Sequence, residues 1–180
     1  MPLRPQVSDQ DHIEGNTNAL IELVEYGDYE CPHCGSAYPV VKRIQKTFGN
    51  NLKFVFRNFP LSNIHPYAAL AAIATEAAAL QGRYWPMHDL IFEHQDRLNR
   101  DSLLAFAQEL ELDLHRFRID LGSLALLEKV EADFESGVRS GVNATPTFFI
   151  NGEKYNNRWE GENMLDFITE KYAHILAPGG

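Results

Sequence analysis

Apolar and polar residues follow two different periods in the first third of the chain. Residues 20–26 are mostly apolar, as in a strand of a sheet that is covered on both faces. From residue 32 to about residue 48 apolar side chains recur at helical spacing. Residues 52–57 then alternate apolar with charged over most of their length, as strands do. The order strand, helix, strand predicts a parallel βαβ unit.

The middle of the chain, residues 62–140, has helical patterns instead. An alanine-rich segment covers residues 68–80, and Ser102 stands where it would cap a later helix. Apolar residues repeat at helical spacing in two further sets: Leu103, Phe106, Ala107 and Leu110, and then Leu127, Val130, Phe134 and Val138. We therefore expect four or five helices in this stretch, without an internal repeat.

Strand character returns near the end of the chain. Two short runs, residues 147–150 and 153–155, are separated by Asn-Gly, which is a strong signal for a β-hairpin. A last helix is expected from about Gly161, and residues 178–180 are expected to form a frayed tail. The complete order is βαβ, several helices, then ββα.

Composition narrows the classes of protein that this order allows. With 180 residues, 44% of them apolar, the chain can bury one sizeable core, so we expect a single domain. A formal charge of −9 without a basic stripe argues against nucleic-acid binding. No apolar run approaches the roughly 20 residues of a membrane span, and the first residues do not read as a secretory signal. We expect a cytoplasmic protein, or an extracytoplasmic one if a leader was removed.

Both cysteines of the chain stand in one motif, Cys31-Pro32-His33-Cys34, where a predicted strand leads into a predicted helix. Two thiols at this spacing can close a small ring, and a thiolate at a helix N-terminus is stabilised by unpaired N–H groups and the helix dipole. Pro32 suits the first turn because it has no N–H to satisfy. An imidazolium at His33 would lower the pKa of Cys31 further. The motif predicts a redox pair, with Cys31 attacking and Cys34 resolving.

Two simpler interpretations of the motif are weaker. A structural disulfide across four residues would close a very short loop and stabilise little. A metal site needs about four ligands, and beyond the cysteines only scattered histidines remain, so no metal is expected.

The cluster of Tyr84, Trp85 and His88 is interpreted as core, since aromatic groups at helical spacing are more often packed than catalytic.

Four local features together resemble the DsbA-like thiol-disulfide oxidoreductases. They are Glu25 on the strand before the motif, the CPHC motif itself, Tyr84-Trp85-Pro86-Met87-His88, and Val142-Asn143-Ala144-Thr145-Pro146-Thr147. The resemblance covers roughly residues 17–176 and implies a thioredoxin fold with an inserted all-helical subdomain. The chain would then divide into a polar arm (1–16), a two-part thioredoxin core (17–61 and 141–176) and a helical insertion (62–140).

The resemblance also implies roles for individual residues. Pro146 would follow a cis peptide bond beside the thiols, and the backbone of Thr145 would pair with a substrate peptide. Glu25 shares strand parity with Ile21 and Leu23, so its carboxyl should be buried with a raised pKa and take part in proton transfer at Cys34. Substrates would be protein or peptide thiols and disulfides, renewed by a separate redox partner. We expect a monomer without an organic cofactor.

Three questions remain open at the level of sequence. Typical DsbA oxidases have valine where this chain has Thr145, so the exchange could run as oxidation, reduction or isomerisation, although the arm is too short to be a dimerisation domain of the isomerase type. The chain could instead be a redox-sensing or interaction module, since DsbA-like domains also occur attached to membrane transporters. A glutathione transferase or isomerase of the kappa branch is a further alternative, but that branch uses a serine nucleophile.

Overall fold

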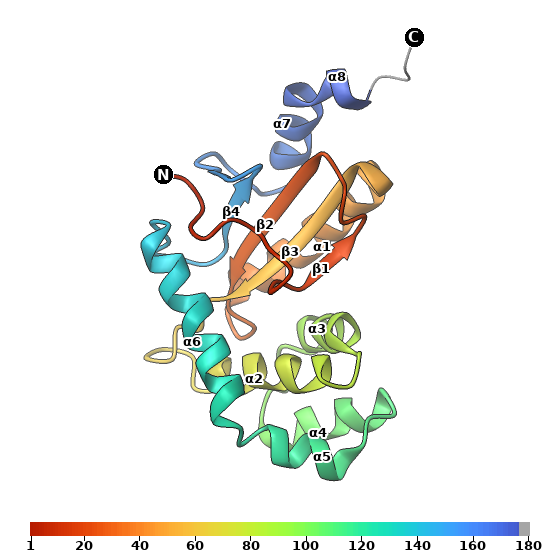
Figure 1. The fold of residues 1–180 in the computed structure, drawn as a ribbon, viewed down its shortest axis with the longest axis vertical. Coiled ribbons are helices and arrows are strands. Elements are labelled where there is room, and N and C mark those ends of the chain that lie inside the picture. The colour runs from red at the N-terminus through yellow and green to blue at the C-terminus, as the bar shows by residue number, and fades with distance from the viewer. Residues whose placement is uncertain (177–180) are drawn as a thin grey trace.

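Five strands form one mixed sheet in the computed structural model, which describes residues 1–176 (Figure 1). The strands lie in the order β1-β3-β2-β4-β5. Only β2 and β3 are parallel, and the other neighbours run antiparallel. The strand bounds are β1 Ile13–Gly15, β2 Ile21–Gly27, β3 Leu52–Asn58, β4 Thr147–Ile150 and β5 Glu153–Lys154. The tail expected at residues 178–180 lies outside the described residues.

The predicted βαβ unit is confirmed. Helix α1 (Pro32–Phe48), followed by the short helix η1 (Gly49–Asn51), connects β2 to its parallel neighbour β3, with Leu23 opposite Phe54. The cysteine motif therefore stands at the carboxyl end of β2, where α1 begins. Crevices at the carboxyl ends of parallel strands are the usual position of sites in α/β sheets.

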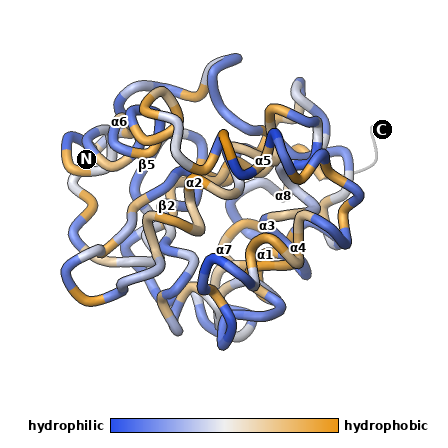
Figure 2. Tube along the Cα trace, turned by 90° about the horizontal axis from the view of Figure 1, so that it is seen from below, coloured by the Kyte–Doolittle hydropathy of each residue, from blue (hydrophilic) through white to orange (hydrophobic). Residues whose placement is uncertain are grey.

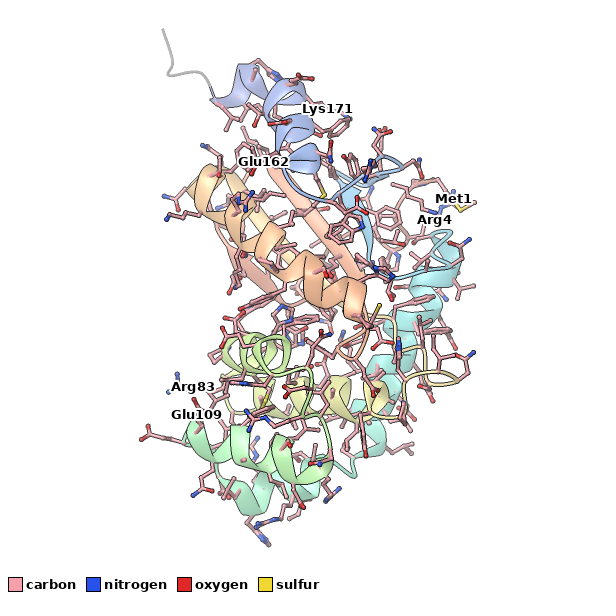
Figure 3. All side chains as sticks on the ribbon, turned by 180° about the vertical axis from the view of Figure 1, so that it is seen from behind. Met1, Arg4, Arg83, Glu109, Glu162 and Lys171 are labelled. Carbon is pink, nitrogen blue, oxygen red and sulfur yellow. The ribbon has the colours of Figure 1, made fainter. Side chains whose placement is uncertain are left out.

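The N-terminal residues are more than a polar arm. Ile13–Gly15 forms strand β1, which adds to the edge of β3 with Ile13 opposite Val55, and Leu3 is buried in the core. Figure 3, seen from the side of α1, shows Met1 and Arg4 beside the end of α6. Sequence periodicity missed β1 because three residues between polar segments are too short to show a period.

Five helices follow β3, within the predicted number. Their bounds are α2 Ala68–Ala79, α3 Tyr84–Glu93, α4 Arg100–Glu109, α5 Leu114–Asp120 and α6 Leu124–Arg139. The expected cap at Ser102 is wrong: Asn99 caps α4, and its side chain accepts a hydrogen bond from the Ser102 N–H at 2.9 Å. Val138, expected on the buried face of α6, is 56% exposed.

Helix α6 connects the helical insertion to the sheet (Figure 1). It rises from α2–α5 to the sheet face that carries Val24 and Tyr26, where Phe134 stacks on Phe59. Gly137 allows this approach, because a Cβ there would lie 2.7 Å from the Phe59 ring. Alternate residues of β2, such as Leu23, face the larger core with α1 and α2. In Figure 2, α2 and β2 carry mostly the hydrophobic colours.

A buried polar network joins the sheet to the insertion. Asn58 at the end of β3 donates to Glu76 of α2 and to Asp133 of α6, at 3.3 and 3.0 Å. His12 reaches the other oxygen of Glu76 at 2.8 Å, and Lys129 pairs with Asp133 at 2.7 Å. Because each carboxylate has several partners, the charges can be buried at limited cost. The network fixes how the insertion sits beside the sheet.

The C-terminal hairpin forms as predicted. Asn151 and Gly152 both have positive φ, 47° and 81°, as a two-residue turn of type I′ requires. Helix α7 begins at Asn163, two residues after Gly161, and covers Asn163–Lys171, with α8 Ala173–Leu176 after it. Pairing of β4 with β2 sets Thr147 opposite Tyr26. The segment just before β4 is thereby brought to the end of β2 that leads to Cys31.

Candidate active site

Cys31 and Cys34 lie at the start of α1, as the motif predicts. Cys31 is the N-cap residue: its N–H donates to the Asp28 carbonyl at 3.1 Å, and its own carbonyl accepts from Gly35 N–H at 3.1 Å. Both cysteines are free thiols, with Cys31 4% exposed and Cys34 fully buried. Cys31 is thus the one that a second molecule could reach.

The pKa of Cys31 is lowered from 9 to about 5. A hydrogen bond from the Cys34 thiol is the largest cause, and partial burial opposes it. Thr145 and the main-chain N–H groups of Cys34 and His33 lower the pKa further. The neutral thiol makes no capping hydrogen bond, so these N–H groups of the first helical turn favour the charged form. At neutral pH Cys31 is therefore a thiolate.

The pKa of Cys34 moves in the opposite direction, well above its ordinary value. Burial is the main cause, and the hydrogen bond to Cys31 and the charges of Glu25 and Cys31 add to it. The Asp28 N–H donates to the Cys34 sulfur at 3.4 Å. Two cysteines three positions apart thus differ in charge at neutral pH, one a thiolate and the other a protonated thiol.

Glu25 lies in the middle of β2 and is buried, 2% exposed, between Phe56 on β3 and Phe148 on β4. Its Oε1 has no hydrogen-bond partner among the described residues. Burial, together with the charge of Cys31, raises the pKa of Glu25 to about 8. The carboxyl is therefore mostly protonated at neutral pH and close to the point at which it exchanges a proton.

Thr145 and Pro146 complete the site from the far end of the sequence. The Thr145–Pro146 peptide bond is cis, the isomer that the resemblance implies. The Cys31 sulfur lies 3.7 Å from the Thr145 carbonyl oxygen, to which the thiol donates when it is protonated. The Thr145 hydroxyl is buried and has no partner within residues 1–176, and Thr145 also lowers the pKa of Cys31. A valine at this position could not supply that hydroxyl.

His33 and Pro32 are both on the surface at the first turn of α1. Pro32 is the first helical residue, as expected. His33 acts on Cys31 through its main-chain N–H, and no hydrogen bond from its ring is formed with the thiol. A charge on the exposed ring would act only through solvent.

Three residues beside the cysteines were not found from the sequence. Asp28 is buried and touches both the cysteines and His65, while Gln95 donates from one amide nitrogen to the carbonyls of Tyr29 and Cys31, both at 2.9 Å. Asp28 belongs to no motif in the sequence, although it lies only three residues before Cys31. His65 and Gln95 come from loops around the insertion, so their proximity depends on the tertiary fold.

The aromatic cluster belongs to the core, as interpreted. His88 is 2% exposed and hydrogen-bonds to the Tyr29 hydroxyl through Nδ1 at 2.8 Å, with burial holding its pKa well below the ordinary value. Tyr84 is also buried and stacks on His12, with ring centroids 3.7 Å apart. Through the hydrogen bond between His88 and Tyr29, this cluster holds the loop that contains Tyr29 in place.

Within residues 1–176 no group of three or more His, Cys, Asp or Glu side chains is arranged to hold a metal ion. No helix of that part is long and apolar enough to cross a bilayer.

A sheet with a central βαβ unit, a dithiol at its first helix and a cis-proline loop beside the thiols defines a thioredoxin-fold protein with a helical insertion. The chain belongs to the thioredoxin family, whose model, described as Thioredoxin, matches residues 7–170. The resemblance to DsbA-like proteins and the expected fold class are confirmed by solved structures.

Three of these structures illustrate the similarity. A thioredoxin-like oxidoreductase from Silicibacter pomeroyi DSS-3 has a TM-score of 0.81 at 23% identity, covering 92% of this chain and 94% of that one. BdbD from Bacillus subtilis has a TM-score of 0.79 at 25% identity, with coverage of 90% and 92%. Wolbachia pipientis alpha-DsbA1 has a TM-score of 0.82 at 21% identity, covering 96% of both chains.

Curated relatives of higher identity are much longer proteins. The Na(+)/H(+) antiporter NhaA 1 of Salinispora arenicola is 41% identical over 169 residues, which are 94% of this chain and 26% of the antiporter. NhaA of Herminiimonas arsenicoxydans is 42% identical over 165 residues, 91% of this chain and 26% of the antiporter. The chain thus spans about a quarter of the length of the relatives it matches.

Proposed function

We propose that this chain exchanges disulfides with protein or peptide substrates through Cys31 and Cys34. The proposal rests mainly on one observation. The pKa of Cys31 is lowered to about 5, whereas the pKa of Cys34 is raised well above its ordinary value. A structural pair of cysteines has no need of such a difference, whereas disulfide exchange needs one thiolate and one thiol held in reserve.

In the reducing direction, the Cys31 thiolate attacks one sulfur of a substrate disulfide. The substrate S–S bond breaks, one substrate thiolate leaves, and a mixed disulfide with Cys31 forms. Cys34 then loses its proton and attacks the Cys31 sulfur, releasing the second substrate thiolate. The substrate gains two electrons and the protein is left with a Cys31–Cys34 disulfide. Oxidation of a substrate dithiol follows the same steps in reverse.

Glu25 and Thr145 support these steps. A carboxyl with a pKa of about 8 can accept the proton of Cys34 during resolution and return it in the reverse direction. The Thr145 carbonyl faces Cys31, so a bound peptide would meet main chain beside the reacting sulfur. The proposed reaction uses no metal and no organic cofactor, and a monomer is sufficient for it.

The reduction potential indicates the direction of exchange. The nucleophile has a pKa of about 7 in thioredoxin and about 3.5 in DsbA, and their potentials are about −270 and about −120 mV. With a Cys31 pKa of about 5, we expect this chain to lie between them. Equilibration with glutathione buffers measures the potential, and insulin reduction measures turnover. A protein whose Cys31–Cys34 disulfide forms but which reduces no substrate disulfide would contradict the proposed function.

The direction bears on the compartment. A potential well above the cytosolic glutathione poise, roughly −220 to −260 mV by extraction, would favour an extracytoplasmic oxidant or isomerase. A potential near or below that poise would favour the cytoplasmic reductant that composition suggests.

His33→Ser is expected to raise the pKa of Cys31 and make the disulfide less oxidising. The ring is exposed, so its charge acts through water and the change should be small and should shrink as salt is added. Thiolate absorbance of the reduced protein against pH, at low and high ionic strength, measures it. An unchanged or lowered pKa at low salt would remove the imidazole from the mechanism.

The antiporter relatives favour a second function, that of a redox-sensing or interaction module beside a transporter. About a quarter of each antiporter matches this chain at close to 40% identity, so the fold occurs joined to such proteins. The two functions differ in turnover. A module would bind a partner differently in its dithiol and disulfide forms yet show no catalytic insulin reduction. An exchange enzyme would turn over many equivalents.

A further inference from the structure

A carboxylate and an imidazole lie in contact beside the dithiol. Asp28 has a fully buried side chain, and its Oδ2 lies 2.7 Å from Nδ1 of His65. The same carboxylate accepts the N–H groups of Glu30 at 2.8 Å and Leu61 at 2.9 Å. Since a carboxylate only accepts hydrogen bonds, Nδ1 of His65 must be the donor.

Asp28 also touches the redox loop through its main chain. Its carbonyl accepts the Cys31 N–H at 3.1 Å, and its N–H donates to the Cys34 sulfur at 3.4 Å. Asp28 is therefore in direct main-chain contact with both cysteines, and its carboxylate, buried away from bulk water, belongs to the same short loop. Left uncompensated, such a charge would oppose formation of a second negative charge on Cys31.

On the basis of the proposed exchange function, we propose that protonated His65 neutralises the buried Asp28 carboxylate and thereby keeps the Cys31 thiolate stable near neutral pH. His65 is a positioning residue in this role, because it acts on Cys31 through Asp28. His33, by contrast, belongs to the motif itself and has an exposed ring without a carboxylate partner.

The charges around His65 favour its protonated form. Three groups face it: Asp28, Glu30 and Cys31. Desolvation would lower the pKa of His65, but the hydrogen bond and charge of Asp28, with smaller contributions from Cys31 and Glu30, outweigh it and raise the pKa above 6.5. The side chain is 17% exposed, so the imidazole can exchange its proton with water. The stabilisation of the thiolate should therefore fade as pH rises through the titration of His65.

Two substitutions at His65 and one matched control test the proposal. His65→Gln removes the charge, and His65→Lys supplies a positive charge that does not titrate in this range. The control is His12→Gln, because His12 also pairs with a buried carboxylate, Glu76 at 2.8 Å, but belongs to the network between the sheet and the insertion. The probe is the thiolate absorbance of each reduced protein, titrated with pH, beside the reduction potential measured at several pH values.

His65→Gln is expected to raise the measured pKa of Cys31 by about 0.5 to 1, the order expected for one uncompensated charge nearby. His65→Lys should keep the pKa close to that of the parent, and its potential should lose the inflection that His65 adds to the pH profile. His12→Gln should leave the pKa unchanged. An unchanged Cys31 pKa in His65→Gln, or the same increase in His65→Lys, would overturn the proposal.

The Cys31 titration and the insulin assay test the role of His65 and the exchange function separately. The Cys31 titration needs no substrate, so it tests the effect of His65 on the Cys31 pKa even if the parent protein has no exchange activity. Conversely, insulin turnover by the parent with an unchanged Cys31 pKa in His65→Gln would support the exchange function and reject the role of His65. Thermal unfolding of each variant identifies any protein that has simply lost its fold.

Discussion

Cys34→Ser is expected to trap the substrate on Cys31 and to lower turnover by about 10³-fold or more. The attack on a mixed disulfide is intramolecular in the parent, and a nucleophile held in place has a large effective concentration. Serine cannot replace it, because a hydroxyl does not form a disulfide. Cys31 keeps its thiolate and its small exposed area of 4%, so we expect the first half of the exchange to continue without the second.

Non-reducing gels and intact mass measure the trapped adduct. The matched control is Cys31→Ser, which keeps only the fully buried thiol of Cys34, and it should form no adduct. The contrast depends on the burial and raised pKa of Cys34. Adduct formation in Cys31→Ser, or full turnover in Cys34→Ser, would show that the roles of the two cysteines are reversed or shared.

The sequence predicted those parts of the site that depend on local chemistry. A proline and two cysteines at a strand-to-helix junction define the start of α1, and Asn-Gly defines the hairpin, because both features depend on a few adjacent residues. The burial of Glu25 also followed, since the two-residue period of a strand places it on the same face as Leu23.

The remaining parts depend on contacts between distant segments. His65 and Gln95 carry no motif of their own, and they reach Asp28 and Cys31 only through the tertiary fold. Asn99 rather than Ser102 caps α4, since the helix begins at Arg100 and Ser102 lies inside its first turn, where its N–H donates to the Asn99 side chain. Strand β1 exists because the edge of β3 is available for pairing, which no local pattern reveals.

The helical insertion contributes directly to the surroundings of the two cysteines. Its loops supply the imidazole on Asp28 and the amide on the Tyr29 and Cys31 carbonyls. Without these partners the Asp28 carboxylate would keep only the N–H groups of Glu30 and Leu61, and the Cys31 carbonyl only the N–H of Gly35. The helical insertion and the chemistry of the site are therefore coupled.

Glu25→Gln is expected to stabilise the protein more at pH 7 than at low pH. The difference in free energy of unfolding between variant and parent should be about 3 kcal/mol larger at pH 7 than below pH 4.5. The folded pKa of Glu25 is about 8 and the ordinary value is 4.5. Below 4.5 the carboxyl is protonated in both states and contributes no pH dependence. Between 4.5 and 8 the unfolded state ionises while the folded state keeps its proton, so stability falls by about 1.4 kcal/mol per pH unit. Glutamine removes this loss because it does not ionise.

Urea unfolding of parent and variant across this pH range measures the difference. Glu22→Gln is the matched control on the same strand, because Glu22 is partly exposed and pairs with Lys53 at 3.2 Å, so its effect should be well below 1 kcal/mol. The same Glu25→Gln protein should resolve a mixed disulfide more slowly, with a pH profile that lacks the step near 8, if the carboxyl accepts the proton of Cys34. A gain in stability with an unchanged kinetic profile would mean that Glu25 is buried at a cost but takes no part in proton transfer.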